Sequence, residues 1–393
     1  MMAGHKDRDH ALLSASGAHR WLACPPSALL GAQFPEEETD AAREGTLAHE
    51  LCEIKLKNYF FAADYGKRKM NKDIKILKEN RLWQNEMMGH SDTYLDYIRS
   101  ATLSFEKQPY AVVEKRVDFS RYVPDGFGTA DCILIGGQVL WVIDFKYGKS
   151  PDGRVSAREN PQLMLYALGA YEAYKMFYPV QKIKMSIVQP RLDNGISEWE
   201  CTLEGLLEFG QYVKQRARLA IKGEGGFNPG RHTCRFCKAG ALCRARADKN
   251  VELAFFTDRK PPLITNDEAG DYLSKGGDIS AWMHGLIEYA LAECLAGRQI
   301  RGWKAVEGKS CRKWTDEAEA LKTLVENGIP EAALYKEVPL SLAQIEKDIG
   351  KKDFEKYVGQ FVIKPPGKPT LVQEQDKRHA VTYKITAGEA FKE

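Results

Sequence analysis

The chain has 393 residues, of which 44% are hydrophobic and 28% charged, so it is long enough for two or three folded domains. Its first ten residues are polar, unlike a signal peptide, and no stretch reaches the roughly 20 apolar residues of a membrane span. We therefore expect a cytoplasmic protein without a membrane partner. The net charge of +3 is nearly neutral, so any nucleic-acid binding depends on local basic patches.

Two such patches are present. Residues 66–78 carry six Lys or Arg side chains against the single acid Asp73, and residues 231–249 carry six against Asp248. Clusters of this kind suit contacts with phosphate groups, although a basic run is more often a solvated face.

Helix and strand patterns alternate through the first 250 residues. The predicted elements are, in chain order, a helix over 37–60, a basic linker, a helix over about 79–107, strands at 111–114 and 116–119, a hairpin over 128–146, a helix from Asn160-Pro161 to about 178, a strand over 183–189 and a helix over about 203–222. Proline suits the first helical position because its missing N–H has no partner there. The order predicts an α/β domain over 1–250.

The remaining residues, 251–393, have a different character. Thr265 with Glu268 and Ser341 with Gln344 have the spacing of capping boxes, and helical patterns cover 279–297 and 315–327. We expect a separate, mainly α-helical domain that ends in a proline-rich tail around Lys364–Pro369.

The predicted hairpin carries the most informative residues. A turn at Gly136-Gly137 places Asp131 opposite Val142, with Asp144 as a diagonal neighbour about 7–8 Å away and Lys146 on the same face. Two converging carboxylates suit a divalent cation, and Lys146 would add the positive charge that phosphodiester hydrolysis requires. The alternative is that all three charges lie at a solvated strand end.

Two helical patterns carry further candidates. His49 follows Gly45 by one turn, and Glu53, one turn later, could accept a hydrogen bond from the imidazole. Gln162 and Tyr166 are also four apart, and both could contact phosphate or a base. A structural histidine, a core tyrosine and an ordinary polar glutamine remain the alternatives.

Three cysteines form one tight cluster, Cys234, Cys237 and Cys243. Thiolates favour zinc or an iron–sulfur cluster, and a fourth ligand must come from elsewhere. His232 would complete a zinc site, and Cys24 is the other candidate. The spacing alone favours zinc.

Two short motifs resemble the end of a phosphate-binding loop, Gly148-Lys149-Ser150 and Gly308-Lys309-Ser310. Ile143 and Trp303 occupy the positions where that loop needs its first glycine, so ATP binding is not predicted.

Taken together, these motifs resemble the RecB-type branch of the PD-(D/E)XK nucleases, and most of all its iron–sulfur members, which include CRISPR-associated RecB-like exonucleases and the AddB nuclease domain. The resemblance covers residues 12 to about 248 and includes Ser14-x-Ser16, Cys24-Pro25, Gly45-x3-His49, Asp131, Asp144-x-Lys146, Gln162-x3-Tyr166 and the three-cysteine run. It implies a restriction-endonuclease-like core with a mixed central sheet flanked by helices.

The same resemblance implies roles for individual residues. Lys146, Asp131, Asp144, Gln162 and Tyr166 would be catalytic. Mn²⁺ or Mg²⁺ would be bound by His49, Asp131, Asp144 and the Phe145 carbonyl. Cys24, Cys234, Cys237 and Cys243 would hold a 4Fe–4S cluster.

The whole chain, tail included, also resembles a phage and prophage protein family without a characterised function. We therefore predict a metal-dependent DNA nuclease of the bacterial host cytoplasm, an exonuclease that processes DNA ends in phage replication or recombination. Its partners would be DNA, single-stranded or with free ends, and a phage recombination or replication protein. The alternative is a DNA-binding recombination accessory protein with a weak or vestigial nuclease site.

Overall fold

The computed structural model describes residues 11–35, 39–252, 265–306, 317–326, 330, 334, 344–346 and 350–362. The packing divides the chain into two units, one ending at Val306 and the other beginning at Glu307. No helix among the described residues is long and apolar enough to cross a bilayer.

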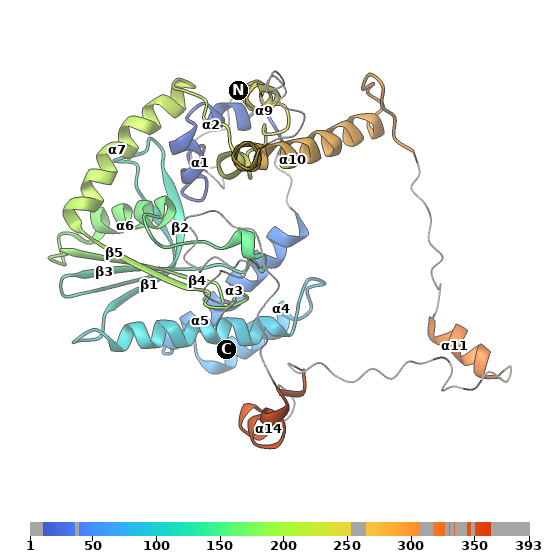
Figure 1. The fold of residues 1–393 in the computed structure, drawn as a ribbon. Coiled ribbons are helices and arrows are strands. Elements are labelled where there is room, and N and C mark those ends of the chain that lie inside the picture. The colour runs from blue at the N-terminus through green and yellow to red at the C-terminus, as the bar shows by residue number, and fades with distance from the viewer. Residues whose placement is uncertain are drawn as a thin grey trace, which may run out of the picture. The chain divides into compact units, whose positions relative to one another are not determined.

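A mixed five-stranded sheet lies at the centre of the first unit (Figure 1). Its strands are β1 (Tyr110–Asp118), β2 (Phe127–Gly136), β3 (Val139–Phe145), β4 (Lys182–Val188) and β5 (Ile196–Thr202), and they lie side by side in that order. β3 and β4 are parallel, and every other neighbouring pair is antiparallel. The expected α/β fold with a mixed central sheet is confirmed.

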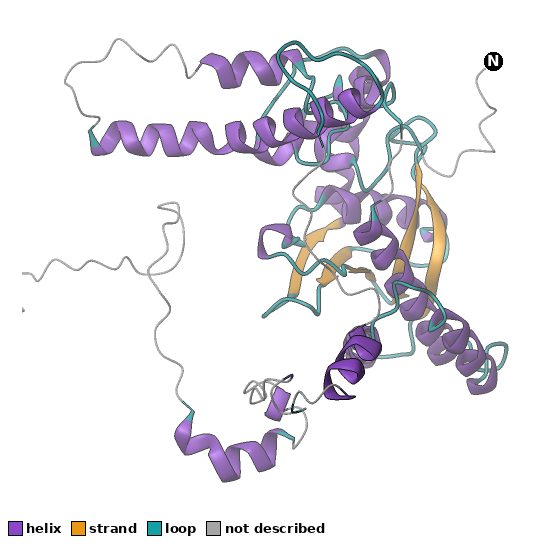
Figure 2. Cartoon of the chain, turned by 90° about the vertical axis from the view of Figure 1, so that its right-hand side faces the viewer, coloured by secondary structure: helices purple, strands orange, loops and turns teal. Residues whose placement is uncertain are grey.

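Helices cover both faces of this sheet (Figures 1 and 2). One face carries α1 (Ala18–Ala23), α2 (Ser27–Gly31), α6 (Pro161–Tyr174) and α7 (Leu203–Lys222), and the other carries α3 (Asp40–Phe60), α4 (Lys67–Leu77) and α5 (Glu86–Leu103). The crossover between the parallel strands β3 and β4 contains α6, as a parallel pair requires.

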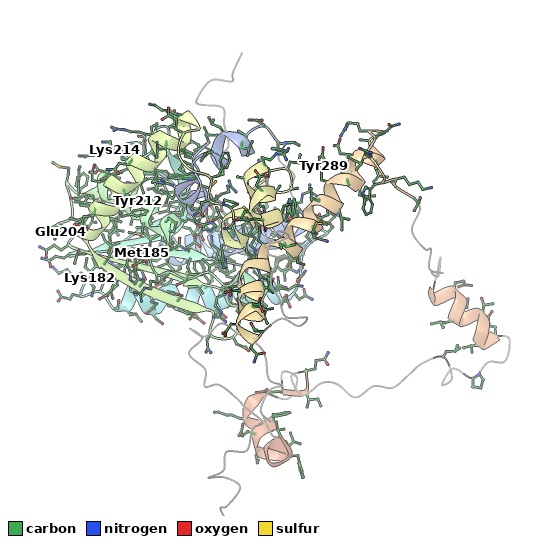
Figure 3. The ribbon with its side chains drawn as sticks, turned by 45° about the horizontal axis from the view of Figure 1, so that its top comes forward. Lys182, Met185, Glu204, Tyr212, Lys214 and Tyr289 are labelled. Carbon is green, nitrogen blue, oxygen red and sulfur yellow. The ribbon has the colours of Figure 1, made fainter. Side chains whose placement is uncertain are left out.

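The strands at the middle of the sheet are apolar on both sides because both sides are covered. Ile133 and Val142 pack toward α6, whereas Leu134 and Ile143 pack toward α3 and α5. Each such side chain contributes roughly 1.5–3 kcal/mol when it is fully buried. Met185 of β4 is likewise buried, while the α7 side chains Glu204, Tyr212 and Lys214 lie along the outside of the molecule (Figure 3).

Capping residues explain where the helices next to the sheet begin. The Asn160 side chain accepts hydrogen bonds from the backbone N–H groups of Gln162 and Leu163, and Pro161 occupies the first helical position. Thr202 caps α7 in the same way, and Gly223 ends it in the left-handed conformation. The start predicted for α6 is confirmed.

Several elements differ from the sequence prediction, and the helix predicted over about 79–107 is α5, which begins only at Glu86 and ends at Leu103. The basic linker contains a helix, α4, whose few apolar side chains, among them the buried Ile74, pack against α3. β5 was not predicted because it is an edge strand of alternating exposed and half-buried residues with little apolar signal. The two short strand signals near residue 114 belong to one continuous strand, β1.

Among the described residues after the sheet domain, the first unit contains the helices α8 (Arg231–Cys234), α9 (Arg244–Glu252) and α10 (Asn266–Leu295). The predicted capping box of Thr265 and Glu268 is confirmed at the start of α10. Arg246 of α9 and Asp278 of α10 form a buried bidentate ion pair, with N–O distances of 2.5 and 2.7 Å. This contact holds α10 against α9 in the first unit, and the domain boundary expected at residue 250 stays a prediction.

The second unit contains α11 (Glu317–Glu326), α14 (Lys351–Val358) and a short 3₁₀ turn at Gly359–Phe361 among its described residues. The capping box predicted at Ser341 and the proline-rich tail around Lys364–Pro369 lie outside the described residues.

Candidate active site

The β2–β3 hairpin turns one residue later than predicted. Gly136 pairs with Val139, so the turn consists of Gly137 and Gln138, and Gly137 adopts a φ of +55°. The prediction that Asp131 lies opposite Val142 is wrong, because Val142 pairs with Ile133. The last pair of this ladder is Cys132 with Ile143, and Asp131 and Asp144 are the next residues along their strands.

Asp131 connects the hairpin to helix α3. Its Oδ2 accepts a hydrogen bond of 2.7 Å from the Phe145 backbone N–H, and its Oδ1 lies 3.4 Å from His49 Nδ1. Burial alone would lower the pKa of His49, but the Asp131 carboxylate outweighs it and raises the pKa to about 8. Burial alone would raise the pKa of Asp131, and His49 holds it below the ordinary range.

Asp144 and Lys146 meet the start of α6. Lys146 Nζ lies 3.0 Å from Asp144 Oδ2 and donates to Gln162 Oε1 at 3.1 Å. The Gln162 amide donates to Asp144 Oδ1 at 3.3 Å and lies 3.2 Å from the Tyr166 hydroxyl. The structure thus brings all four of these predicted residues into one hydrogen-bonded chain.

Burial governs the protonation of the Asp144–Lys146 pair. It raises the pKa of Asp144 to about 6, and Asp131 adds to the rise while Lys146 opposes it. Burial would lower the pKa of Lys146, but Asp144 and Asp131 raise it above its ordinary value. Lys146 is therefore a cation at neutral pH. Asp144 Oδ2 is buried without a hydrogen bond of good geometry, although it lies close to the Lys146 ammonium.

Glu114 is a site residue that the sequence reasoning missed. It lies across from Asp131 where the β1–β2 ladder is interrupted between the pairs Val113–Cys132 and Lys115–Ala130. Its φ of +43° is unusual for a residue with a side chain. Burial and the Asp131 charge raise the pKa of Glu114 to about 7. A single acid within an otherwise apolar strand pattern, Val112-Val113-Glu114, is the signal that was available.

The residues at this end of the sheet fit a divalent cation. Ligand atoms of His49, Glu114 and Asp131 lie within 4.8 Å of one another, which no other three His, Cys, Asp or Glu residues in the described ranges do. Mixed imidazole and carboxylate ligands suit Mn²⁺, and carboxylates suit Mg²⁺. The unsatisfied Asp144 oxygen offers a further ligand nearby. Glu53 forms an ion pair with Lys57, so its predicted contact with His49 stays a prediction.

Four cysteines from opposite ends of the domain line one small cavity of about 10 Å³: Cys24, Cys234, Cys237 and Cys243. His232 does not line it. In a tetrahedral zinc site with Zn–S bonds near 2.3 Å, thiolates lie about 3.8 Å apart. No three of these sulfurs lie within 4.8 Å of one another in this part of the described chain. The thiols are therefore spaced more widely than a single zinc ion requires.

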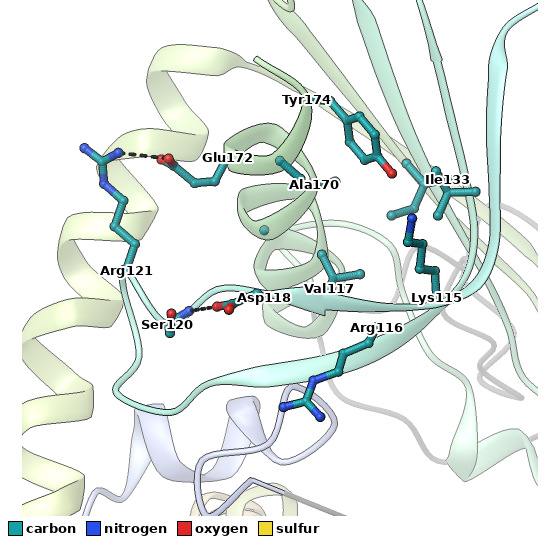
Figure 4. Close-up of a pocket in the computed structure, with 13 residues that line it drawn as sticks. Lys115, Arg116, Val117, Asp118, Ser120, Arg121, Ile133, Ala170, Glu172 and Tyr174 are labelled. Atoms are coloured by element: carbon teal, nitrogen blue, oxygen red, sulfur yellow. Dashed lines mark hydrogen bonds and ion pairs between the residues drawn. The ribbon is translucent and has the colours of Figure 1, made fainter. Parts of the chain in front are cut away.

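A larger pocket of about 530 Å³ lies between the edge strand β1 and the end of α6 (Figure 4). Its rim carries Lys115, Arg116 and Arg121, the last of which pairs with Glu172 at 2.8 Å. None of the residues predicted to be catalytic lines this pocket. It is separate from the carboxylate cluster.

Residues 10–379 match the family described as "Protein of unknown function (DUF2800)", and the chain belongs to this family. Among solved structures, the chain is similar to SSO0001, with a TM-score of 0.25 and 15% identity over 58% of this chain and 96% of that one. It is also similar to a candidate exonuclease from Eubacterium rectale, with a TM-score of 0.31 and 10% identity over 67% of this chain and 97% of that one. Both similarities are too distant to define a reaction.

Proposed function

We propose that this protein is a metal-dependent DNA nuclease with a restriction-endonuclease-like core of the RecB type. The observation that carries the proposal is the convergence of Asp131, Asp144 and Lys146 with His49 at one end of the sheet. Buried charges are costly unless they bind something, and this set has the composition that phosphodiester hydrolysis requires.

His49, Asp131, Asp144 and the Phe145 carbonyl would hold Mn²⁺ or Mg²⁺, and Glu114 is a further candidate ligand. Such an ion supplies Lewis-acid charge at the phosphate and makes the attacking water more acidic. The Lys146 ammonium would bind a phosphate oxygen and stabilise the charge that develops there. Gln162 fixes the position of Lys146 through its 3.1 Å hydrogen bond.

We further propose exonuclease action on DNA ends in phage replication or recombination, in which a phage recombination or replication protein is the partner. This part of the proposal is supported by the sequence resemblance to RecB-type nucleases and to phage proteins. In the same proposal Tyr166, whose hydroxyl lies 3.2 Å from the Gln162 amide nitrogen, binds a phosphate or stacks on a base.

The test is cleavage of end-labelled linear and circular DNA, single- and double-stranded, with Mn²⁺ or Mg²⁺. Asp144→Asn and Lys146→Gln should abolish cleavage, whereas Lys182→Gln, at an exposed ion pair with Glu200, should not. Circular dichroism checks that each variant is folded. Full cleavage by the Asp144 and Lys146 variants would refute the proposed site. DNA binding without any cleavage by the wild type would favour an accessory role instead.

We also propose that Cys24, Cys234, Cys237 and Cys243 hold a 4Fe–4S cluster. The shared cavity and the wide spacing of the thiols support this assignment over zinc with His232. Anaerobically purified protein should be brown and contain four iron and four sulfide per chain, and Cys237→Ser should remove both. A colourless protein with one zinc per chain, lost in His232→Ala, would establish the alternative.

A further inference from the structure

We propose that helix α4 is a surface on which the protein holds the phosphate backbone of DNA. The inference rests on the proposed function in one respect, the choice of DNA as the polyanion. It concerns residues outside the candidate active site, and it is tested by binding rather than by cleavage.

The charge of α4 is concentrated and unpaired. Six cations lie on this helix or just after it, and all are exposed: Lys67, Arg68, Lys69, Lys72, Lys75 and Lys78. None of them has a carboxylate partner in the described part of the chain. Asp73, the acid within the helix, instead accepts a hydrogen bond from the Tyr65 hydroxyl. Two of the cations lie over aromatic rings, Lys69 over Tyr65 and Lys78 over Trp83.

This arrangement opposes the stability of the helix. The first turn contains three cations and no acid, although the positive end of the helix dipole is there. Like charges one turn apart, such as Arg68 and Lys72, each cost about 0.2–0.5 kcal/mol. The helix is retained because Ile74 is buried against neighbouring helices. A bound polyanion would remove the repulsion and stabilise the N-terminal end.

The position of α4 suits a substrate of the candidate site. Asp144 and Lys146 lie at the carboxyl end of β3, and the parallel strand β4 ends at the same end of the sheet. Arg191, just beyond β4, pairs with Glu86 at the start of α5 and with Glu44 of α3. The connection between α4 and α5 therefore lies at this end of the sheet too. Figure 1 shows α3, which carries His49, between the sheet and α4.

The spacing of the cations favours a phosphate backbone. Arg68, Lys72 and Lys75 follow one another at about one-turn intervals along one face, each turn rising about 5.4 Å. A nucleic-acid strand offers one phosphate per about 3.4 Å of axis, so several phosphates lie within reach of this row. Phosphate contacts of this kind position a strand without reading its sequence.

The experiment compares wild-type protein with the triple variant Arg68→Gln, Lys72→Gln and Lys75→Gln. Fluorescence anisotropy with single-stranded and duplex oligonucleotides is measured in EDTA, which prevents cleavage, from 50 to 200 mM salt. Losing three phosphate contacts should reduce the slope of log K against log salt by about 2 for single strands and about 3 for duplex. The matched control is Lys107→Gln, Lys182→Gln and Arg218→Gln, three exposed cations outside α4.

Hydrolysis of a small phosphodiester, bis-p-nitrophenyl phosphate, should be unchanged in the α4 variant because that substrate does not reach α4. An unchanged salt slope in a folded α4 variant would overturn the inference. An equal decrease of the salt slope in the control variant would overturn it too. The inference would also be overturned if the α4 variant bound DNA like the wild type but no longer bound anionic vesicles of phosphatidylserine with phosphatidylcholine. A wild type that binds DNA with the α4-dependent slope but never cleaves would refute the nuclease and leave this surface established.

Discussion

Replacing Glu114 by glutamine removes one carboxylate from the crowded end of the hairpin and keeps the size of the side chain. In the folded protein without metal, the pKa of Glu114 is about 7 against its ordinary 4.5, first because of burial and then because of Asp131. At 1.36 kcal/mol per pKa unit, ionising it in the fold costs at most about 3 kcal/mol more than in the unfolded chain. Because the side chain is only partly buried, we expect about 1–3 kcal/mol.

The sign follows from the direction of the shift. The folded state holds the Glu114 proton more tightly than the unfolded state. The contribution of this protonated side chain to the free energy of unfolding is therefore complete below pH 4.5 and is lost as pH rises through about 7. Glu114→Gln cannot ionise. It should therefore match the wild type at pH 4.5 and be more stable by about 1–3 kcal/mol at pH 8.

Urea unfolding in EDTA at pH 4.5 and pH 8, followed by circular dichroism, measures this difference. Mn²⁺ at pH 8 should stabilise the wild type more than the variant, because the ion would offset the negative charge of the Glu114 carboxylate, which the variant lacks. A variant with the same advantage over the wild type at both pH values would refute the reasoning. Glu204→Gln, at an exposed acid of α7 outside this cluster, serves as the control.

Two further predictions concern packing. Asp278→Ala leaves Arg246 buried and unpaired, so the local stability of α10 should fall by about 3–5 kcal/mol in hydrogen exchange. Burial would raise the pKa of Asp278, but its hydrogen bonds with Arg246 hold it below 3.8; the wild-type contact should therefore persist at pH 5 and weaken only as pH falls below 4. Gly128→Ala places a Cβ 2.7 Å from the Tyr166 ring, so it should lower cleavage at least tenfold by displacing that ring. Gly89→Ala, with open space around it, should leave cleavage unchanged, and a wild-type rate in Gly128→Ala would contradict the role given to Tyr166.

Much of the site could be predicted because its residues follow regular patterns. Gln162 and Tyr166 lie one turn apart on α6, and Asp144 and Lys146 follow a strand whose apolar run is unambiguous. Their contacts follow from helix and strand periodicity once the sheet is known. The turn was misplaced by one residue because Gly136 and Gly137 both permit it, and only the structure shows which one adopts positive φ.

Glu114 could not be found by periodicity, because strand alternation fails beside it. Val112 and Val117 are five residues apart, yet both pack in the core beneath α6, and on β2 so do Ala130 and Ile133. Side chains an odd number of residues apart share a face only where the regular strand is interrupted. A positive φ at a glutamate has no sequence signature, so the sequence shows an acid after an apolar run but not that the alternation breaks there.

The cavity lined by Cys24 and the later cysteines also has a consequence for synthesis. The N-terminal segment packs late, since Arg20 donates to the Phe236 carbonyl at 2.5 Å and Arg216 donates to that of Leu22 at 2.7 Å. At about 5–20 residues per second, a ribosome needs roughly 10–40 s to travel from Cys24 to Cys243. Cys24 therefore emerges first of these four cysteines, and it cannot line the shared cavity until the other three have been synthesised.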